Sequence, residues 1–139
     1  MGKPLILVVD DQVGIRRLLY EAFGDDGFEV ELASGGAEAL RKLGQCSPQV
    51  VLLDLRMPGV SGLDTLKELR SRQPGLNVII MTAYGEMDLV REARRLGVDW
   101  CITKPFDLVE LRYMVKGVIA GGTAGGTAEH ACAGLVAAT

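Results

Sequence analysis

The sequence has few of the residues that crosslink extracellular proteins or catalyse hydrolysis. It contains three cysteines, Cys46, Cys101 and Cys132, which lie far apart and form no CxxC pair. This odd, scattered set argues against a disulfide framework or a zinc site and favours a reducing, cytoplasmic location. The one histidine, His130, lies near the C-terminus, outside the regularly patterned part of the chain. A catalytic triad that contains histidine is therefore excluded from the folded part.

The sequence also lacks an excess of positive charge and any long apolar run. Its net charge at pH 7 is −3 and its isoelectric point is about 5.2, so we expect this chain to bind no nucleic acid. No apolar run approaches the roughly 18 residues of a membrane span, and the first run is too short for a signal peptide. We expect no membrane association. At 139 residues, 48% of them hydrophobic, the chain suits one globular domain with a proper core.

Short apolar runs alternate five times with stretches of helical spacing. The expected strands are Leu5–Val9, Phe28–Ala33, Val50–Leu53, Val78–Met81 and Trp100–Thr103. This alternation is typical of an α/β fold, in which five helices cover both faces of a five-stranded parallel sheet. The runs LILVV, VVLL and VIIM are continuously apolar, as strands buried on both faces are. FEVEL alternates apolar and acidic residues and so indicates an edge strand, which favours the doubly wound, flavodoxin-like order 2-1-3-4-5.

The composition changes after Ala120. Residues 121–128 read GGTAGGTA, a tandem repeat of small residues without amphipathic period. We therefore predict a folded domain over residues 1–120 and a flexible tail rich in Gly, Ala and Thr over residues 121–139.

Polar residues stand at the ends of four of the expected strands. Asp10 and Asp11 follow the first strand and Asp54 the third, while Thr82 and Lys104 follow the fourth and fifth. Each has an ordinary alternative when taken alone, since Asp11 could cap the next helix and Asp54 could belong to a turn. Thr82 could equally be a strand residue and Lys104 a solvated loop lysine. The carboxyl ends of parallel strands meet at one edge of the sheet, however, so we expect one shared site.

Three carboxylates, a hydroxyl and an ammonium group together indicate phosphoryl chemistry. Carboxylates a few ångströms apart raise one another's pKa unless a cation neutralises them, and oxygen ligands with open positions favour Mg²⁺. A carboxylate can accept a phosphoryl group and form an aspartyl-phosphate. A metal ion, a lysine and a hydroxyl around that group would stabilise the charge on its oxygens.

The motifs VVDDQ, VVLLDLRMPGVSG, MTAYG and ITKPFD occur in this order. With them, residues 3–120 resemble the receiver domain of response regulators in bacterial two-component signalling. DDQVGIRRLL, IIMTAYGE and KPFD are similar to the single-domain, sporulation phosphorelay branch of that family. The resemblance implies a cytoplasmic signalling module that phosphorylates and dephosphorylates itself and is no metabolic enzyme.

The resemblance also implies a role for each residue of the expected site. Asp54 would be the phosphoacceptor and Asp11 a direct Mg²⁺ ligand, with Asp10 acting mainly through a metal-bound water. The backbone carbonyl of Arg56 would be a further ligand. Thr82 would be the switch hydroxyl that moves onto a phosphoryl oxygen, and Lys104 would pair with the phosphoryl group.

Three further expectations concern residues near the site, two of them implied by the resemblance and the third based on the size of two side chains that flank the acceptor. The peptide bond between Lys104 and Pro105 should be cis, although by default only about 5–6% of such bonds are. Cys101 stands where the family usually has an aromatic switch residue, so the usual coupling of hydroxyl and ring cannot operate, and we expect a small buried apolar residue there. Arg56 and Tyr84 are bulky, and we expect them to slow hydrolysis of the aspartyl-phosphate.

In the resembling proteins, a surface beside the site docks a histidine kinase or the helix bundle of a histidine phosphotransferase. The residues that correspond to it here are Gln12, Gly14, Ile15, Leu18, Tyr84, Pro105 and Phe106. Leu18 and Leu19 cannot both lie in the core stripe of one helix, so one of them must face outward. We expect a monomer in the unphosphorylated state.

Other functions remain as alternatives. The same motifs occur in transcriptional regulators, so the chain could be the N-terminal receiver of a longer DNA-binding protein. It contains no helix-turn-helix segment or basic patch, so DNA binding would lie outside it. A Mg²⁺-dependent phosphatase would need a second acid where Arg56 stands, and dinucleotide binding would need a G-x-G-x-x-G motif after the first strand.

Overall fold

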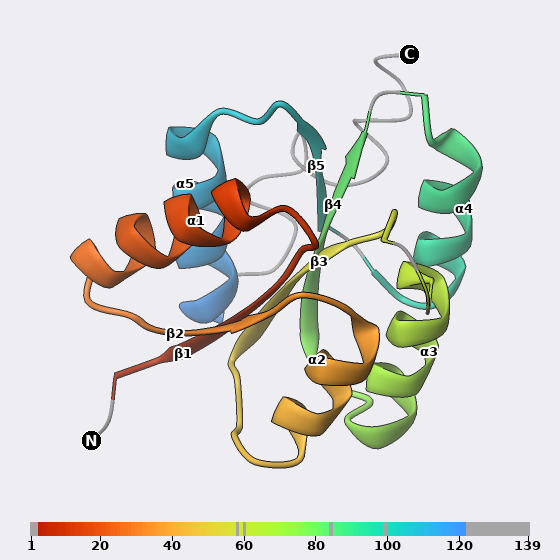
Figure 1. The fold of residues 1–139 in the computed structure, drawn as a ribbon, viewed down its shortest axis with the longest axis horizontal. Coiled ribbons are helices and arrows are strands. Elements are labelled where there is room, and N and C mark those ends of the chain that lie inside the picture. The colour runs from red at the N-terminus through yellow and green to blue at the C-terminus, as the bar shows by residue number, and fades with distance from the viewer. Residues whose placement is uncertain (1–2, 58, 60, 84, 99, 122–139) are drawn as a thin grey trace.

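The computed structural model describes residues 3–57, 59, 61–83, 85–98 and 100–121. Within them, strands and helices alternate five times along the chain (Figure 1). The strands are β1 (Leu5–Val9), β2 (Glu29–Ala33), β3 (Val50–Asp54), β4 (Asn77–Ala83) and β5 (Trp100–Lys104). The helices are α1 (Val13–Asp25), α2 (Gly36–Leu43), α3 (Gly62–Arg72), α4 (Met87–Arg95) and α5 (Leu108–Ile119). Across these described residues, no helix is long and apolar enough to span a membrane.

The strands form one parallel sheet in the order β2-β1-β3-β4-β5, which confirms the predicted topology. The central strands β1 and β3 are buried over almost their whole length. The edge strand β2 alternates exposed Glu29 and Glu31 with half-buried Val30 and Leu32. A continuously apolar strand therefore lies inside the sheet, where both of its faces are covered. A strand that alternates apolar and acidic residues lies at the edge.

Helices cover both faces of the sheet (Figure 1). Alternate residues of a strand point to opposite faces, so Ile6 and Val8 of β1 pack with residues of α1 and α5 in one apolar cluster. Leu7 and Val9 pack with residues of α2, α3 and α4 in the other. Each buried apolar side chain stabilises the fold by roughly 1.5–3 kcal/mol relative to leaving it exposed.

Three strands extend beyond their apolar runs into the polar residues of the predicted site. β3 includes Asp54, β4 includes Thr82, and β5 includes Lys104. The cause is main-chain pairing, which continues past the last apolar side chain and places Asp54 opposite Met81. Phe28, by contrast, lies outside β2, because its N–H donates to the carbonyl of Phe23 at the end of α1.

The start of α3 lies against the loop that follows Asp54. The N–H of Gly62 donates to the carbonyl of Leu55 at 3.2 Å. A Cβ atom at Gly62 would overlap the Cα of Leu55 and the carbonyl oxygen of Asp54. A residue larger than glycine at this position would therefore push the acidic end of β3 out of place.

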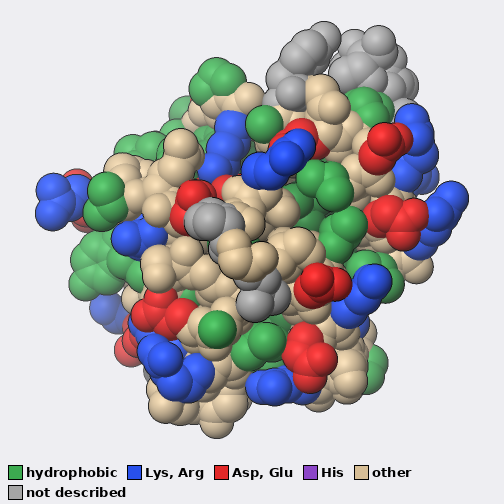
Figure 2. All heavy atoms as spheres, turned by 45° about the vertical axis from the view of Figure 1, so that its right-hand side comes forward, with side chains coloured by type: hydrophobic (Ala, Val, Ile, Leu, Met, Phe, Trp, Pro, Cys, Tyr) green, Lys and Arg blue, Asp and Glu red, His purple; other side chains and the backbone are tan. Residues whose placement is uncertain are grey.

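The described surface mixes charges of both signs. On α4, Arg91 pairs with Asp88 and Arg95 with Glu92, three residues apart in each case. Figure 2 shows acidic and basic side chains next to one another on the side of the molecule where α3 and α4 lie. Such exposed pairs contribute little to stability and give this side no strong single-sign field.

Residues 122–139 lie outside the described part, so the division into a domain and a tail stays a prediction.

Candidate functional site

The carboxyl ends of β1, β3 and β5 bring three acids and one lysine together. One carboxylate oxygen from each of Asp10, Asp11 and Asp54 lies within 4.8 Å of the other two. Asp10 and Asp54 are buried, whereas Asp11 is exposed. The Nζ of Lys104 donates to Asp10 Oδ2 at 2.7 Å and to Asp54 Oδ2 at 3.2 Å. The expected shared site at this edge of the sheet is therefore present in the fold.

The charges in this cluster do not balance. Burial raises the pKa of Asp54, and the charge of Asp10 raises it further, against the opposing effects of the Arg56 backbone N–H and the Lys104 ammonium. Burial acts to lower the pKa of Lys104, but its bonds and charge interactions with Asp10 and Asp54 prevail and raise it. Three carboxylates and one ammonium leave a formal charge of two negative units. A divalent cation with oxygen ligands fits this charge and these donors.

Asp11 is placed for the cluster and does not cap α1. The N-cap residue is Gln12, and its side chain makes no capping hydrogen bond. The N–H of Gln12 donates instead to Asp10 Oδ1 at 2.9 Å. The alternative that Asp11 serves only as a helix cap is therefore wrong. Asp10 orders the start of α1, and Asp11 presents its carboxylate at the exposed side of the cluster.

Thr82 lies at the end of β4 and is bonded to an acid that the sequence analysis did not single out. Its Oγ1 donates to Glu86 Oε1 at 2.8 Å, and the N–H of Ala83 donates to the same oxygen at 2.9 Å. The Nε of Arg56 pairs with Glu86 Oε2. Burial acts to raise the pKa of Glu86, but the bonds from Arg56, Ala83 and Thr82 hold it below its ordinary value. Glu86 is therefore a buried, charged carboxylate with three donors.

Arg56, which follows β3, contacts both Asp54 and Glu86. Its backbone N–H donates to Asp54 Oδ1 at 3.0 Å, while its side chain is 74% exposed and reaches Glu86. The residue thus links the acidic cluster to the bonds around Thr82. The metal-binding role expected of its carbonyl stays a prediction.

Comparison with known proteins identifies the family of this chain. The profile of the response regulator receiver domain matches residues 6–116. The chain belongs to the response regulator receiver family. Among its relatives is the sporulation initiation phosphotransferase F of Bacillus subtilis strain 168, which is 44% identical over 116 residues, or 84% of this chain and 94% of the relative. The regulatory protein AtoC of Escherichia coli K12 is 45% identical over 80% of this chain, which spans 24% of its length.

Solved receiver structures have the same fold. The Vibrio cholerae chemotaxis protein CheY4 superposes with a TM-score of 0.78 at 28% identity and covers 84% of this chain and 99% of its own. A response regulator receiver domain from Clostridium thermocellum superposes with a TM-score of 0.79 at 33% identity, over 84% of this chain and 94% of its own. Each of these two likenesses covers 84% of this chain.

A groove beside the acidic cluster of this receiver contains most of the residues predicted to dock a partner. It is lined by Gln12, Ile15, Leu18, Ala83, Lys104, Pro105 and Phe106. Gly14 is not among the lining residues, and Tyr84 lies outside the described part of the chain. Leu18 is 43% exposed while Leu19 is fully buried, so one of the two does face outward as predicted.

Two smaller predictions about the receiver are confirmed. The Lys104–Pro105 peptide bond is cis. Cys101 is buried among apolar residues of β3, β4 and the neighbouring helices, as a small apolar residue would be.

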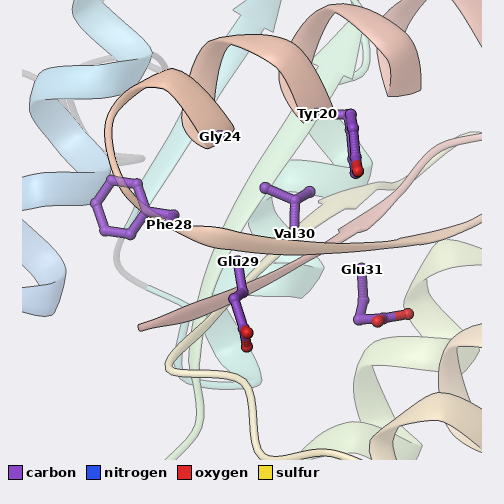
Figure 3. A pocket seen from close by; sticks show the side chains of 6 residues that line it. All are labelled: Tyr20, Gly24, Phe28, Glu29, Val30 and Glu31. Carbon is purple, nitrogen blue, oxygen red and sulfur yellow. The ribbon is translucent and has the colours of Figure 1, made fainter. Parts of the chain in front are cut away.

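A second hollow lies at the edge of the sheet between α1 and β2, where Tyr20, Gly24 and Phe28 are among its lining residues (Figure 3). Its lining contains none of the predicted site residues.

Proposed function

We propose that this receiver accepts a phosphoryl group onto Asp54 from the phosphohistidine of a histidine kinase or phosphotransferase, in a reaction that requires Mg²⁺. The signal then passes on by phosphotransfer or by binding to a partner protein. The observation that carries this proposal is the convergence of Asp10, Asp11 and Asp54 within 4.8 Å, with Lys104 bonded to two of them. A site that merely stabilised the fold would not gather carboxylates in excess over cations.

The ligands proposed for Mg²⁺ are Asp11 directly, Asp10 mainly through water, Asp54, and the backbone carbonyl of Arg56. When bound, Mg²⁺ would neutralise the cluster and offset negative charge on the transferring phosphoryl oxygens. The formal charge and the oxygen donors of the cluster support this choice of metal.

The residues of the chain have distinct tasks in the transfer. A carboxylate oxygen of Asp54 forms a bond to phosphorus while the bond from phosphorus to the donor nitrogen breaks, and the electron pair stays on the imidazole. Lys104 already bonds Asp54 Oδ2, so its ammonium needs a small movement to hold a phosphoryl oxygen. The Thr82 hydroxyl donates to another phosphoryl oxygen. These donors act in a partly buried site, where they are worth more than in water.

The groove between the start of α1 and the β5–α5 loop is the proposed docking surface for the donor protein. It lies next to the acidic cluster, because Gln12 and Lys104 line it and also bond to each other at 3.2 Å. Ile15, Leu18 and Phe106 supply its apolar contacts. An apolar groove beside a reactive carboxylate suits a helical partner that must present its phosphohistidine at close range.

We further propose a cytoplasmic, monomeric protein in the unphosphorylated state that makes no contact with nucleic acid or membrane. The scattered cysteines, the net charge of −3 and the mixed surface charge support this. Relatives such as AtoC, a regulatory protein by its name, match through a quarter of their length. Their other activities are not proposed for this chain.

The test is incubation with acetyl phosphate, a small phosphodonor, followed by intact-mass analysis with and without Mg²⁺. We expect one phosphoryl adduct with Mg²⁺ and none when the metal is chelated. No adduct under either condition would overturn the proposed function. An equal adduct without metal would overturn the role of Mg²⁺.

A further inference from the structure

Glu86 is a buried acid outside the acidic cluster, and none of the expected roles uses it. It is the N-cap residue of α4, yet its side chain makes no capping bond to that helix. The carboxylate turns back to β4 and takes the Thr82 hydroxyl and the Ala83 N–H on one oxygen. Arg56 pairs with the other oxygen. Burying a carboxylate costs free energy, and the ion pair with Arg56 and the two hydrogen bonds offset that cost.

The bond between Thr82 and Glu86 competes with the proposed role of Thr82. A threonine hydroxyl has one proton to donate. While that proton is held by Glu86 Oε1, 2.8 Å from Thr82 Oγ1, it is not available to a phosphoryl oxygen on Asp54. The Glu86 carboxylate thus holds, in the unmodified protein, a donor that the phosphorylated protein needs.

We propose that Glu86 is a positioning residue that retains the Thr82 hydroxyl until Asp54 is phosphorylated, and that loss of this bond carries the change to α4. The inference rests on the proposed function and adds its regulation. Phosphorylation breaks the bond from Thr82, and Glu86 keeps Ala83 and Arg56 as partners. Because Glu86 is the N-cap residue of α4, a change in its contacts reaches the first turn of that helix directly.

This route requires no aromatic residue at position 101. Cys101 is small and buried in the core, so no ring is present there to swing inward when Thr82 moves. Glu86 supplies a second partner for Thr82 that lies on the loop between β4 and α4. The coupling proposed here therefore acts from β4 to α4 through a hydrogen bond rather than through packing at β5.

Glu86→Gln tests the idea, because it keeps the shape of the side chain and removes its charge. A hydrogen bond to a charged acceptor is about twice as strong as one to a neutral acceptor, so the variant should release Thr82 more easily. Beryllofluoride with Mg²⁺, a mimic of the phosphoryl group, should bind the variant about fivefold more tightly than the wild type. Isothermal titration measures this affinity.

Two further variants make the result specific. Glu92→Gln removes an exposed charge from the same helix, where Glu92 pairs with Arg95, and should bind beryllofluoride as the wild type does. In a Thr82→Ala background, Glu86→Gln should have no effect, because the bond that it weakens is already absent. Acetyl phosphate labelling followed by intact mass should rank the variants in the same order.

Unchanged or weaker binding by Glu86→Gln would overturn the inference, and so would a full effect in the Thr82→Ala background. Failure of the wild type to bind beryllofluoride or to take up a phosphoryl group would instead overturn the proposed function. A variant-free measurement covers the case in which Glu86→Gln does not fold. In the wild type, the ¹³C resonance of the Glu86 carboxyl carbon should shift when beryllofluoride binds, and that of Glu92 should not. A Glu86 resonance that stays in place would contradict the inference.

Discussion

Near each end of α1 an aspartate lies beside a basic side chain, half-buried Asp26 at the C-terminal end and buried Asp54 of β3 beyond the N-terminal end, and the pKa values of the two shift in opposite directions. At the C-terminal end, both carboxylate oxygens of Asp26 accept hydrogen bonds from Arg112 of α5, with Lys116 at 3.9 Å. The bonds from Arg112 hold the pKa of Asp26 below its ordinary value. Beyond the N-terminal end, burial raises the pKa of Asp54, and Lys104 is shared with Asp10.

The two aspartates differ in burial and in the balance of charge around them. Asp26 has two cations, and its fork-shaped pairing with a guanidinium ties α1 to α5. Asp54 is buried and shares one cation with another acid, and both the burial and the charge of Asp10 raise its pKa. The first arrangement stabilises the fold. The second leaves an excess of negative charge that can bind a metal ion, beside a carboxylate that can accept a phosphoryl group. Variants near the N-terminal end of α1 should therefore affect phosphoryl transfer, and variants near its C-terminal end should affect stability.

The largest expected effect concerns the groove at the start of α1. Leu18→Ala should slow phosphotransfer from a phosphorylated histidine donor protein about tenfold, because buried apolar anchors dominate docking energy. Labelling by acetyl phosphate should be unchanged, since no docking is involved. Tyr20→Ala is the matched control, because Tyr20 is exposed on α1 but does not line this groove. Equal losses with both donors would contradict the docking role.

The next largest expected effect is on the midpoint of thermal unfolding without metal, measured for variants of the two aspartates. Asp26→Asn should lower the midpoint by about 5 °C, because the charged pair with Arg112 is lost. Asp54→Asn should raise it by about 2 °C, because one negative charge leaves the crowded cluster. Asp25→Asn, at the exposed neighbour of Asp26, should change little. An equal fall in the unfolding midpoint for Asp26→Asn and Asp54→Asn would contradict the difference proposed between the two aspartates.

A pH series sharpens the same comparison. Because the pKa of Asp26 is lower in the folded state than its ordinary value of 3.8, its pairing contributes stability that is fully present above that value. This contribution is lost as the pH falls through the lower, folded value. The difference in unfolding midpoint between wild type and Asp26→Asn should therefore be constant from pH 6 to 8 and shrink in acid. A difference that persists in strong acid would mean that the pairing is not electrostatic.

These contrasts also show what could be predicted from the sequence. The strand order followed from apolar patterning, and the meeting of Asp10, Asp54 and Lys104 followed from parallel strands ending at one edge. Glu86 was missed because an acid before a helix ordinarily favours the helix dipole. Its turn back to Thr82 depends on the path of the β4–α4 loop. A glutamate four residues after a strand-end hydroxyl is the signal that could have found it.

The smallest expected effect concerns how long the phosphorylated state lasts. Arg56 is mostly exposed beside Asp54, and we predict that its side chain hinders the approach of water to the phosphorylated carboxylate. Arg56→Asn should therefore speed decay of the aspartyl-phosphate by about threefold, or roughly 0.6 kcal/mol in the barrier. The decay of the adduct after donor removal, followed by intact mass, measures this. A lifetime equal to that of the wild type would contradict the shielding role.

The proposed function depends most directly on Asp54. After incubation with acetyl phosphate and Mg²⁺, intact-mass analysis should show one phosphoryl adduct on the wild type and on Asp64→Asn, a change at an exposed acid of α3. Asp54→Ala should show none. An adduct of equal yield on Asp54→Ala, or none on the wild type, would contradict the central claim.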